Sequence, residues 1–475
     1  MGKSNRFYAD IMALHVEVTG SCILVNLVFP NFTKKVLVDC GLFQELDYAD
    51  LNKTLPFDAS KIDYVIVTHN HVDHTGRLPL LVKNGYRGDI HMSYTTTKLI
   101  GNALGDSYKV LRCKSKLFNE PNLYSIDDVE ETLKHVKGHP YEESVRLDDN
   151  IKITFFMNGH LPGAACVLLQ AKYRDHSKYY QDINLLFTGD YNNKNLFFDV
   201  PPIPKWVHQL PITIIQESTY GKMDSSEIKC VFEENMLSAI KENKEIVVPV
   251  FSLGRSQEIL YTLQSWQNEG KLSKDIPIYL DGKLAMSYTN IYLTDGLDNK
   301  KECMDFIPEN FTFISSQEMR STIMADHSCK IILSTSGMGS HGPCQTYLPA
   351  YLKRENALIH FTGYCAEETL GRKLYECTAN DKIDVFGLQV VKKADVRFTS
   401  EFSAHAKADE LIDFLRPFES LKFVLVNHGE KDSKEIYANR IIDEINPTDG
   451  VGILERDYLF RVDGYGLKRS FSSKF

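Results

Sequence analysis

The stretch THNHVDHTG at residues 68–76 decides how the rest of this sequence is interpreted. It places three histidines and an aspartate within six positions, at His69, His71, Asp73 and His74. The cluster follows the short β-branched run at 64–67, which the pattern predicts to be a buried strand. It therefore lies at the carboxyl end of a strand, where α/β sheets present their functional residues.

These four side chains are of the types that bind zinc. Imidazole nitrogens and carboxylate oxygens coordinate Zn²⁺ at about 2.0–2.2 Å, and a short loop can aim several of them at one point. A catalytic zinc normally takes three protein ligands, so four candidates in six residues favour two adjacent metal ions. A polar solvated loop is the structural alternative, and it would be the better interpretation of a lone histidine.

The chain as a whole has the size and pattern of a two-domain α/β protein. Its 475 residues exceed the usual size of one domain. Strand and helix patterns alternate along the sequence, which is typical of the α/β class. Four prolines fall within residues 200–211, and this composition predicts a connection between domains.

The composition and the opening residues favour a cytoplasmic location. Its opening residues lack the pattern of a secretory signal, and no run of about 18 apolar residues could span a bilayer. The ten cysteines are scattered singly, as expected of reduced thiols in a cytoplasmic protein. The net charge of −9 argues against coating nucleic acid through overall positive charge, although a local basic channel stays open.

Further candidate ligands share one context, an apolar strand that ends beside a glycine. They are His160 in NGHLPG, Asp190 in FTGD and His428 in NHGE. Asp39 ends a strand in the same way, in VDCG. Each is a common structural residue when taken singly, so their repeated placement carries the prediction that they complete the metal shell.

These motifs, in their order, resemble those of a known superfamily. HNHVDH, GHLPGAA and FTGD, with VDCG upstream, resemble the motifs of the metallo-β-lactamase fold hydrolases. QESTYG at 216–221, FSAHA at 402–406 and NHGE at 427–430 resemble motifs A, B and C of the β-CASP subgroup. That subgroup includes the cleavage and polyadenylation nuclease, RNase J and Artemis, and compact bacterial and archaeal relatives are the most similar.

The resemblance implies a fold and its domain boundaries. The expected class is α/β, an αββα metallo-β-lactamase sandwich interrupted by an inserted α/β β-CASP cap domain. The first domain would comprise residues 1–208 and 389–475, and the cap would comprise residues 209–388.

The resemblance also implies the site and its chemistry. Two Zn²⁺ ions would share one set of ligands, namely His69, His71, Asp73, His74, His160, Asp190 and His428. The first ion would take His69, His71 and His160, the second the ligands Asp73, His74 and His428, and Asp190 would bridge them. Asp39 would hold the loop of ligands from behind. Catalytic roles fall to His405 as general acid, to Glu217 as its partner and to Asp73.

Substrate contacts are expected from backbone and side-chain donors that follow glycine-rich turns. The candidates for binding phosphate are Arg255, Ser334, Thr335, Ser336, Gly337 and Arg372. Residues 337–342 also fit GxGxxG after a strand, but no clear acidic partner follows about 20 residues on, so the dinucleotide interpretation is weak.

The sequence therefore predicts a zinc-dependent ribonuclease that hydrolyses phosphodiester bonds by a two-metal mechanism in RNA processing or decay. We expect endonucleolytic cleavage, with 5′–3′ exonuclease activity as an open alternative. We also expect single-stranded RNA as partner, a homodimer as an open alternative, and no membrane. RNA-directed members of the subgroup carry histidine at motif C, as at His428, whereas Artemis carries valine. A DNA nuclease of the Artemis type, a non-catalytic RNA-binding subunit and a small-molecule hydrolase of the lactamase or glyoxalase kind remain the alternatives.

Overall fold

The chain folds into two compact units in the computed structural model. The structure describes residues 7–174, 180–295, 297–363, 365, 369–456, 458–463 and 466–471. The first unit comprises the described parts of Met1–Asn195, Asp199–Ser225 and His405–Phe475, and the second comprises Leu196–Phe198 and Ser226–Ala404. The packed units differ from the expected domain boundaries at two places. Residues 209–225 were expected in the cap but pack with the first unit, and residues 389–404 were expected in the first domain but pack with the second unit. The reason for the first difference is β11 (Ile212–Glu217), which pairs with strands of the first unit on both sides.

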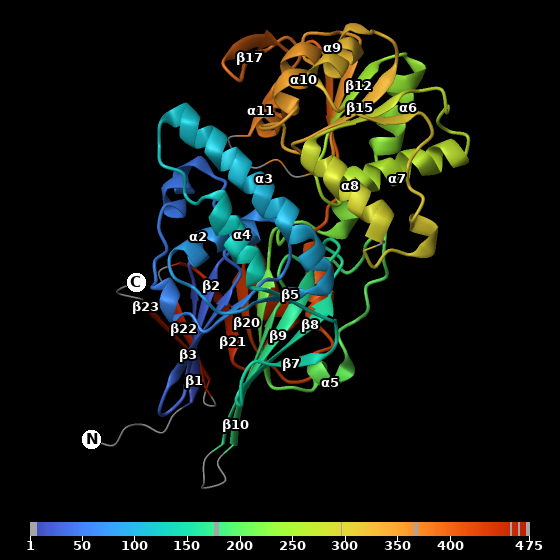
Figure 1. Ribbon diagram of the computed structural model, residues 1–475. Helices are drawn as coiled ribbons and strands as arrows, with labels where there is room; N and C mark the ends of the chain where they lie inside the picture. Colours follow the sequence, from blue (N-terminus) through green and yellow to red (C-terminus); the bar gives the residue numbers. More distant parts are fainter. Residues whose placement is uncertain are drawn as a thin grey trace. The chain divides into compact units, whose positions relative to one another are not determined.

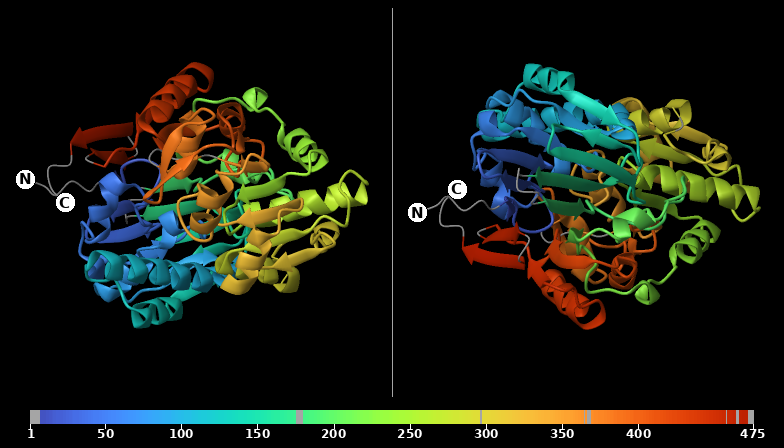
Figure 2. Two further views of the ribbon diagram at one scale, coloured as in Figure 1. Left: turned by 90° about the horizontal axis from the view of Figure 1, so that it is seen from above. Right: turned by 90° about the horizontal axis from the view of Figure 1, so that it is seen from below.

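Two β-sheets form the centre of the first unit (Figures 1 and 2). The first sheet has the order β23-β22-β1-β2-β3-β4-β5-β6, with bounds Gly466–Phe471, Tyr458–Asp463, Tyr8–Ala13, Ile23–Val28, Thr33–Val38, Tyr64–Ile66, Ile90–Ser93 and Val136–His139. The second has the order β21-β20-β11-β10-β9-β8-β7, and its remaining bounds are Gly450–Ile453, Leu421–Asn427, Tyr180–Phe187, Ala165–Arg174, Ile151–Met157 and Ser144–Arg146.

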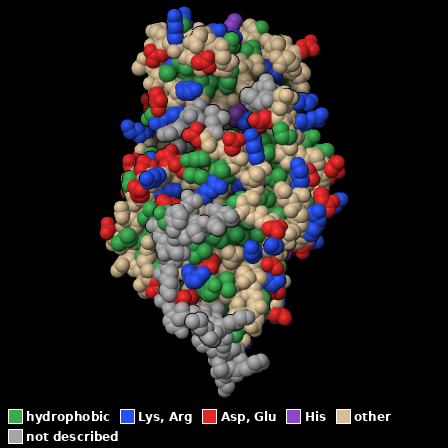
Figure 3. Space-filling model, turned by 90° about the vertical axis from the view of Figure 1, so that its left-hand side faces the viewer, with side chains coloured by type: hydrophobic (Ala, Val, Ile, Leu, Met, Phe, Trp, Pro, Cys, Tyr) green, Lys and Arg blue, Asp and Glu red, His purple; other side chains and the backbone are tan. Residues whose placement is uncertain are grey.

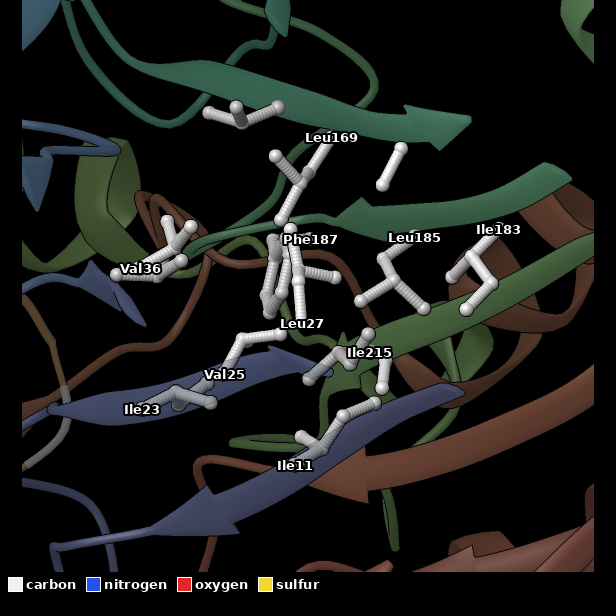
Figure 4. Close-up of a cluster of buried hydrophobic side chains, with 14 of the residues drawn as sticks. Ile11, Ile23, Val25, Leu27, Val36, Leu169, Ile183, Leu185, Phe187 and Ile215 are labelled. Carbon is white, nitrogen blue, oxygen red and sulfur yellow. The ribbon is translucent and has the colours of Figure 1, made fainter. Parts of the chain in front are cut away.

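Alternating side chains explain why both faces of each sheet are covered. In β3, Val36 and Val38 point into the core between the sheets, whereas Leu37 belongs to the outer cluster beneath the helices. In β10, Leu185 and Phe187 face inward. Figure 4 shows these inner side chains of the two sheets directed toward one another.

Helices cover the outer face of each sheet. On the first sheet these are α1 (Val72–Thr75), α2 (Leu78–Lys83), α3 (Tyr94–Phe118) and α4 (Ile126–Lys134). On the second they are α5 (Lys205–His208), α12 (Ala408–Leu415) and α13 (Lys431–Glu444). The layer order is helix, sheet, sheet, helix, which confirms the expected αββα sandwich.

The second unit is built on a parallel sheet of six strands, β14-β13-β15-β12-β16-β19. Their bounds are Phe311–Phe313, Ile278–Asp281, Lys330–Ser334, Glu245–Pro249, Ala357–Phe361 and Asp395–Phe398. Its helices are α6 (Phe232–Lys241), α7 (Arg255–Asn268), α8 (Lys283–Asp295), α9 (Gln317–Ala325), α10 (Cys344–Tyr351) and α11 (Leu370–Glu376). A two-stranded hairpin, β17 (Lys382–Val385) and β18 (Leu388–Val391), completes it. This is the inserted α/β domain that the motifs imply.

The strand directions in the first unit bring distant segments to one edge. Strands β10, β11 and β20 run parallel, so Asp190, Glu217 and His428 all follow carboxyl ends at the same edge of the second sheet. Strands β3 and β4 are also parallel, and they deliver Asp39 and the 68–76 loop at their carboxyl ends. Residues 364 and 366–368, within the stretch GYCAEETLGRKL (363–374) that contains Arg372, lie outside the described residues.

The surface carries both signs of charge. Figure 3 shows Lys and Arg side chains interspersed with Asp and Glu side chains over one face. Among the described residues, no helix is both long enough and apolar enough to cross a bilayer.

We expect the core between the sheets to be sensitive to truncation at Leu185, which is completely buried there. Replacing Leu185 by Ala should lower the free energy of unfolding by about 2–5 kcal/mol, because it removes apolar contacts and leaves a cavity. The half-exposed Ile436 on α13 offers a control, since Ile436→Ala should change it by less than about 0.5 kcal/mol. Urea unfolding, followed by amide hydrogen exchange in β9 and β10, measures both; equal effects would contradict the packing described.

Candidate metal centre

Three imidazole nitrogens from two segments converge on one point. His71 Nδ1 lies 3.1 Å from His69 Nε2 and 3.0 Å from His160 Nε2. Nitrogens bound tetrahedrally to one Zn²⁺ at about 2.0–2.1 Å would stand about 3.3 Å apart. The spacing therefore suits three ligands of one metal ion.

A second group lies on the other side of Asp190. His74 Nε2 and His428 Nε2 are 3.3 Å apart, and Asp73 Oδ2 is 3.8 Å and 3.9 Å from these two nitrogens. With Asp190 the group offers two imidazoles and two carboxylates within 4.8 Å of one another. This donor set also suits a divalent metal ion.

Asp190 faces both groups with different oxygens. Its Oδ1 is 3.2 Å from His74 Nε2 and 3.3 Å from His428 Nε2. Its Oδ2 is 3.5 Å from His69 Nε2 and 3.6 Å from His160 Nε2. Oδ1 is buried and has no hydrogen-bond partner among the described residues, which is the pattern expected of an oxygen that faces a cation.

The backbone allows Asp190 to approach the 68–76 loop closely. Gly189 has φ of +56°, and a Cβ atom there would lie 2.8 Å from Cβ of Thr68. Gly41 is tighter still, since a Cβ atom would lie 1.5 Å from the carbonyl oxygen of Asp73. Both glycines of FTGD and VDCG are therefore required by contact with the loop of ligands.

Asp39 fastens that loop from behind. Its carboxylate accepts hydrogen bonds from the backbone N–H of Thr68 at 2.8 Å and from the Thr68 hydroxyl at 2.9 Å. The same carboxylate lies 2.7 Å from His74 Nδ1. A carboxylate on the rear nitrogen fixes the ring with Nε2 directed at the metal position, as is usual for zinc-binding histidines.

His405 and Glu217 lie beside the two groups and form a pair. His405 Nδ1 is 3.0 Å and 2.9 Å from the two oxygens of Glu217, and His405 Nε2 is 3.9 Å from Asp190 Oδ2. Burial acts to lower the pKa of His405, but the charge and hydrogen bond of Glu217 outweigh it and raise the pKa above its usual value. By contrast, burial lowers the pKa of His69 well below its usual range, as suits a neutral ligand.

Three polar residues that hold the ligands were not expected from the sequence. Thr219 Oγ1 lies 3.1 Å from His428 Nδ1. Asn158 accepts from the N–H of His160 at 3.1 Å and donates to the carbonyl oxygen of Asp190 at 2.9 Å. Thr68 contacts His69 Nδ1 at 3.1 Å. Each lies within a quoted stretch, but Thr and Asn are too common in loops to signal such a role.

The candidates for phosphate binding lie in the second unit. Ser334 ends β15, and Thr335, Ser336 and Gly337 form the turn after it. Arg255 begins α7, where its side chain is buried, donates to the carbonyl oxygens of Thr362 and Phe402, and pairs with Glu258 at 3.0 Å. Arg372 is half-buried on α11 and pairs with Glu376 at 2.7 Å. Their contact with substrate stays a prediction.

Comparisons with known proteins agree with this architecture. Residues 16–171 match the model of the metallo-β-lactamase superfamily, residues 256–374 match the Beta-Casp domain, and residues 389–449 match the Zn-dependent metallo-hydrolase RNA specificity domain.

Several relatives are similar over most of this chain. Ribonuclease TTHA0252 of Thermus thermophilus is 30% identical over 88% of this chain and 91% of its own length. The RNase J-like protein of Methanocaldococcus jannaschii is 30% identical over 86% of this chain and 90% of its own length. Transcription termination factor FttA of Methanosarcina mazei is 29% identical over 87% of this chain and 66% of its own length. The chain therefore belongs to the β-CASP family of the metallo-β-lactamase superfamily and is a metal-dependent hydrolase.

Proposed function

We propose that this protein is a zinc-dependent ribonuclease that hydrolyses phosphodiester bonds of single-stranded RNA at a pair of metal ions. The observation that carries the proposal is the position of Asp190, whose two oxygens face two separate groups of ligands at 3.2–3.6 Å. A single metal ion would leave one of these groups without a function.

In this proposal each metal ion has its own ligands and shares Asp190. One Zn²⁺ would be held by His69, His71 and His160, and the other by Asp73, His74 and His428. Divalent ions held there supply Lewis acidity for attack of water on the phosphodiester. Asp39 and Thr219 keep the rear nitrogens of His74 and His428 engaged, so that the ligating nitrogens stay directed at the metal positions.

His405 is placed to donate the proton that the leaving oxygen needs. Its Nδ1–H donates to Glu217, so the proton available for transfer is the one on Nε2, on the side of Asp190. The raised pKa keeps more of the ring protonated near neutral pH, which favours the acid form. Glu217 itself accepts from the N–H groups of Tyr191 and Thr219, so its position is fixed.

RNA is favoured as the substrate by the comparisons and by His428. The match at residues 389–449 is to an RNA specificity domain, and two of the relatives named above are a ribonuclease and an RNase J-like protein. His428 supplies one of the nitrogens of the second group, so the residue that distinguishes RNA-directed members has a physical function here. The complete set of ligands supports turnover over a purely binding role.

The sheet of the second unit supports a phosphate-binding role for its turns. In open parallel sheets, ligands bind beyond the carboxyl ends of the strands, where the strand order reverses. Strand β12 lies centrally, between β15 and β16, and its outgoing turn leads to Arg255. The turns after β15 and β16 carry Ser336 and Gly363 at the same edge. We expect this edge, with Arg372 on the adjacent α11, to contact the RNA backbone.

Asp190→Ala should abolish both metal binding and cleavage. Removal of the shared carboxylate leaves each group one ligand short, so zinc content should fall from two ions per chain to one or fewer, and RNA cleavage to background. Asp182→Ala, an exposed aspartate on the same strand β10, should change neither. Elemental analysis and cleavage of labelled RNA provide the measurements, and full activity of Asp190→Ala would remove its bridging role.

His405→Ala should separate chemistry from metal binding. We expect zinc content to stay at the wild-type value while the cleavage rate falls by about 10²–10⁴-fold, the usual contribution of a general acid. His208→Ala on α5 is the control, because His208 packs on Phe418 outside the metal centre. If His405→Ala loses zinc, the residue is a ligand and not the acid.

Circular RNA should be opened by this protein, since the expected activity includes endonucleolytic cleavage. Incubation of a labelled circular RNA with the zinc-loaded protein should give a linear product before shorter fragments. The same RNA in linear form is the control for activity. Digestion of the linear form alone would assign purely exonucleolytic action.

A further inference from the structure

Helix α3 of the first unit carries a stripe of cations on its solvent face. Of the 25 residues in this helix, five are Lys or Arg and only Asp106 is acidic, although the whole chain has a net charge of −9. At 100° per residue, four of the five cations fall within about 40° of one line along the helix. These four form the α3 stripe, defined as Lys98, Lys109, Arg112 and Lys116.

The stripe lies opposite the face by which the helix is anchored. On α3, Leu99, Ile100 and Leu104 are buried, and Ile100 and Leu104 belong to the hydrophobic cluster on the outer face of the first sheet. All four cations of the stripe are exposed, and none of them forms an ion pair with another described residue. Between Lys98 and Lys109 the stripe passes over Gly105, where a Cβ atom would meet nothing within 4 Å. The surface along the stripe is therefore open.

An aromatic side chain extends the stripe at its beginning. Tyr94 is 58% exposed and falls on the same side of the helix as Arg112. Its ring lies against Gly138 of β6, where a Cβ atom would come within 2.6 Å of it, so the strand supports the ring from beneath. Cations that follow the backbone and an exposed aromatic ring on which a base can stack are the two features of surfaces that bind single strands.

The unpaired charge favours a polyanion over plain solvation as the reason for the stripe. Exposed helix faces that serve only solubility usually carry both signs, with acidic and basic residues paired three or four positions apart. Two acidic residues stand in these relations to the stripe, but neither forms an ion pair with it. Asp106 precedes Lys109 by three positions, and Glu120, four positions after Lys116, pairs with Lys53 at 3.4 Å. Cations concentrated in this way attract phosphates against an overall negative charge.

We propose that the α3 stripe binds the phosphate backbone of single-stranded RNA, as a contact separate from the metal centre. This inference rests on the proposed ribonuclease function. From Lys98 to Lys116 the helix rises about 27 Å, long enough for several consecutive phosphates. Because the contacts are to phosphates, the binding is independent of sequence and of the 2′-hydroxyl group.

The test replaces three cations of the stripe together, as Lys109→Gln, Arg112→Gln and Lys116→Gln. Loss of three phosphate contacts should weaken binding about 10- to 100-fold at about 0.1 M salt and reduce the slope of log Kd against log salt by about 2. The matched control is the triple variant Lys61→Gln, Lys114→Gln and Lys205→Gln. It removes the same charge from exposed positions, and Lys114 lies on α3 but about 160° from the stripe.

Fluorescence anisotropy measures binding to a labelled single strand of about 20 nucleotides, prepared both as RNA and as DNA of the same sequence. The protein used is metal-loaded and carries His405→Ala. We expect equal losses for RNA and DNA in the stripe variant and little change in the control. Equal changes in the two triple variants, or an unchanged salt slope, would overturn the proposal. The proposal would also be overturned if the stripe variant kept its affinity for nucleic acid but lost binding to vesicles of anionic lipid. That result would assign the stripe to a membrane surface.

A second readout separates this proposal from the ribonuclease proposal. Hydrolysis of bis(p-nitrophenyl) phosphate, whose single phosphate cannot occupy the metal centre and the stripe at once, should be unchanged in the stripe variant with His405 intact. The KM for the long RNA should rise by the same factor as Kd, with kcat unchanged. If the wild-type protein hydrolyses neither substrate, the ribonuclease proposal fails. If hydrolysis of the small diester falls in the stripe variant alone, the stripe is not a contact separate from the metal centre.

Discussion

The buried carboxylate of Asp190 needs positive charge around it, and this need explains how the ligand-bearing segments of the first unit are arranged. Asp190 is almost completely shielded from water, and one of its oxygens has no hydrogen-bond partner among the described residues. Leaving such a group uncompensated costs several kcal/mol, so cationic charge is needed around it. Five imidazole nitrogens lie 3.2–3.9 Å from its oxygens, and a divalent metal ion held among them would supply the compensating charge. The two sheets, which deliver their carboxyl ends to one edge, are the framework that keeps these groups together.

The residue types and their order made the fold and the metal centre predictable to a large degree. The short β-branched run at 64–67 matches β4 (Tyr64–Ile66) to within one residue. The seven predicted ligands meet because each follows a strand, and parallel strands end at the same edge of a sheet. Helix α3 begins after Ser93, whose hydroxyl accepts a hydrogen bond from the N–H of Thr96 as an N-cap. Local patterns of this kind are decided by neighbours in the sequence.

Contacts between segments that are far apart in the sequence were not predictable. The hydrogen bond from Thr219 to His428 spans 209 positions, and nothing in the local pattern distinguishes this threonine from others. Arg255 is a second case, because nothing in the sequence indicates that its buried guanidinium donates to the carbonyl oxygens of Thr362 and Phe402. The boundary between the units along the sequence also depends on the pairing of β11 with β10 and β20. A change in composition near residues 200–211 does not reveal this pairing.

The order of the segments has a consequence for synthesis on the ribosome. Strand β20, which carries His428 at its end, is an inner strand of the second sheet, between β11 and β21, yet it is made only after the whole inserted unit. A nascent chain therefore holds six of the seven predicted ligands long before the sheet can close or the second group of ligands is complete. Hydrolytic capacity would appear only when translation is nearly finished, so a growing polypeptide could not attack the messenger from which it is being translated.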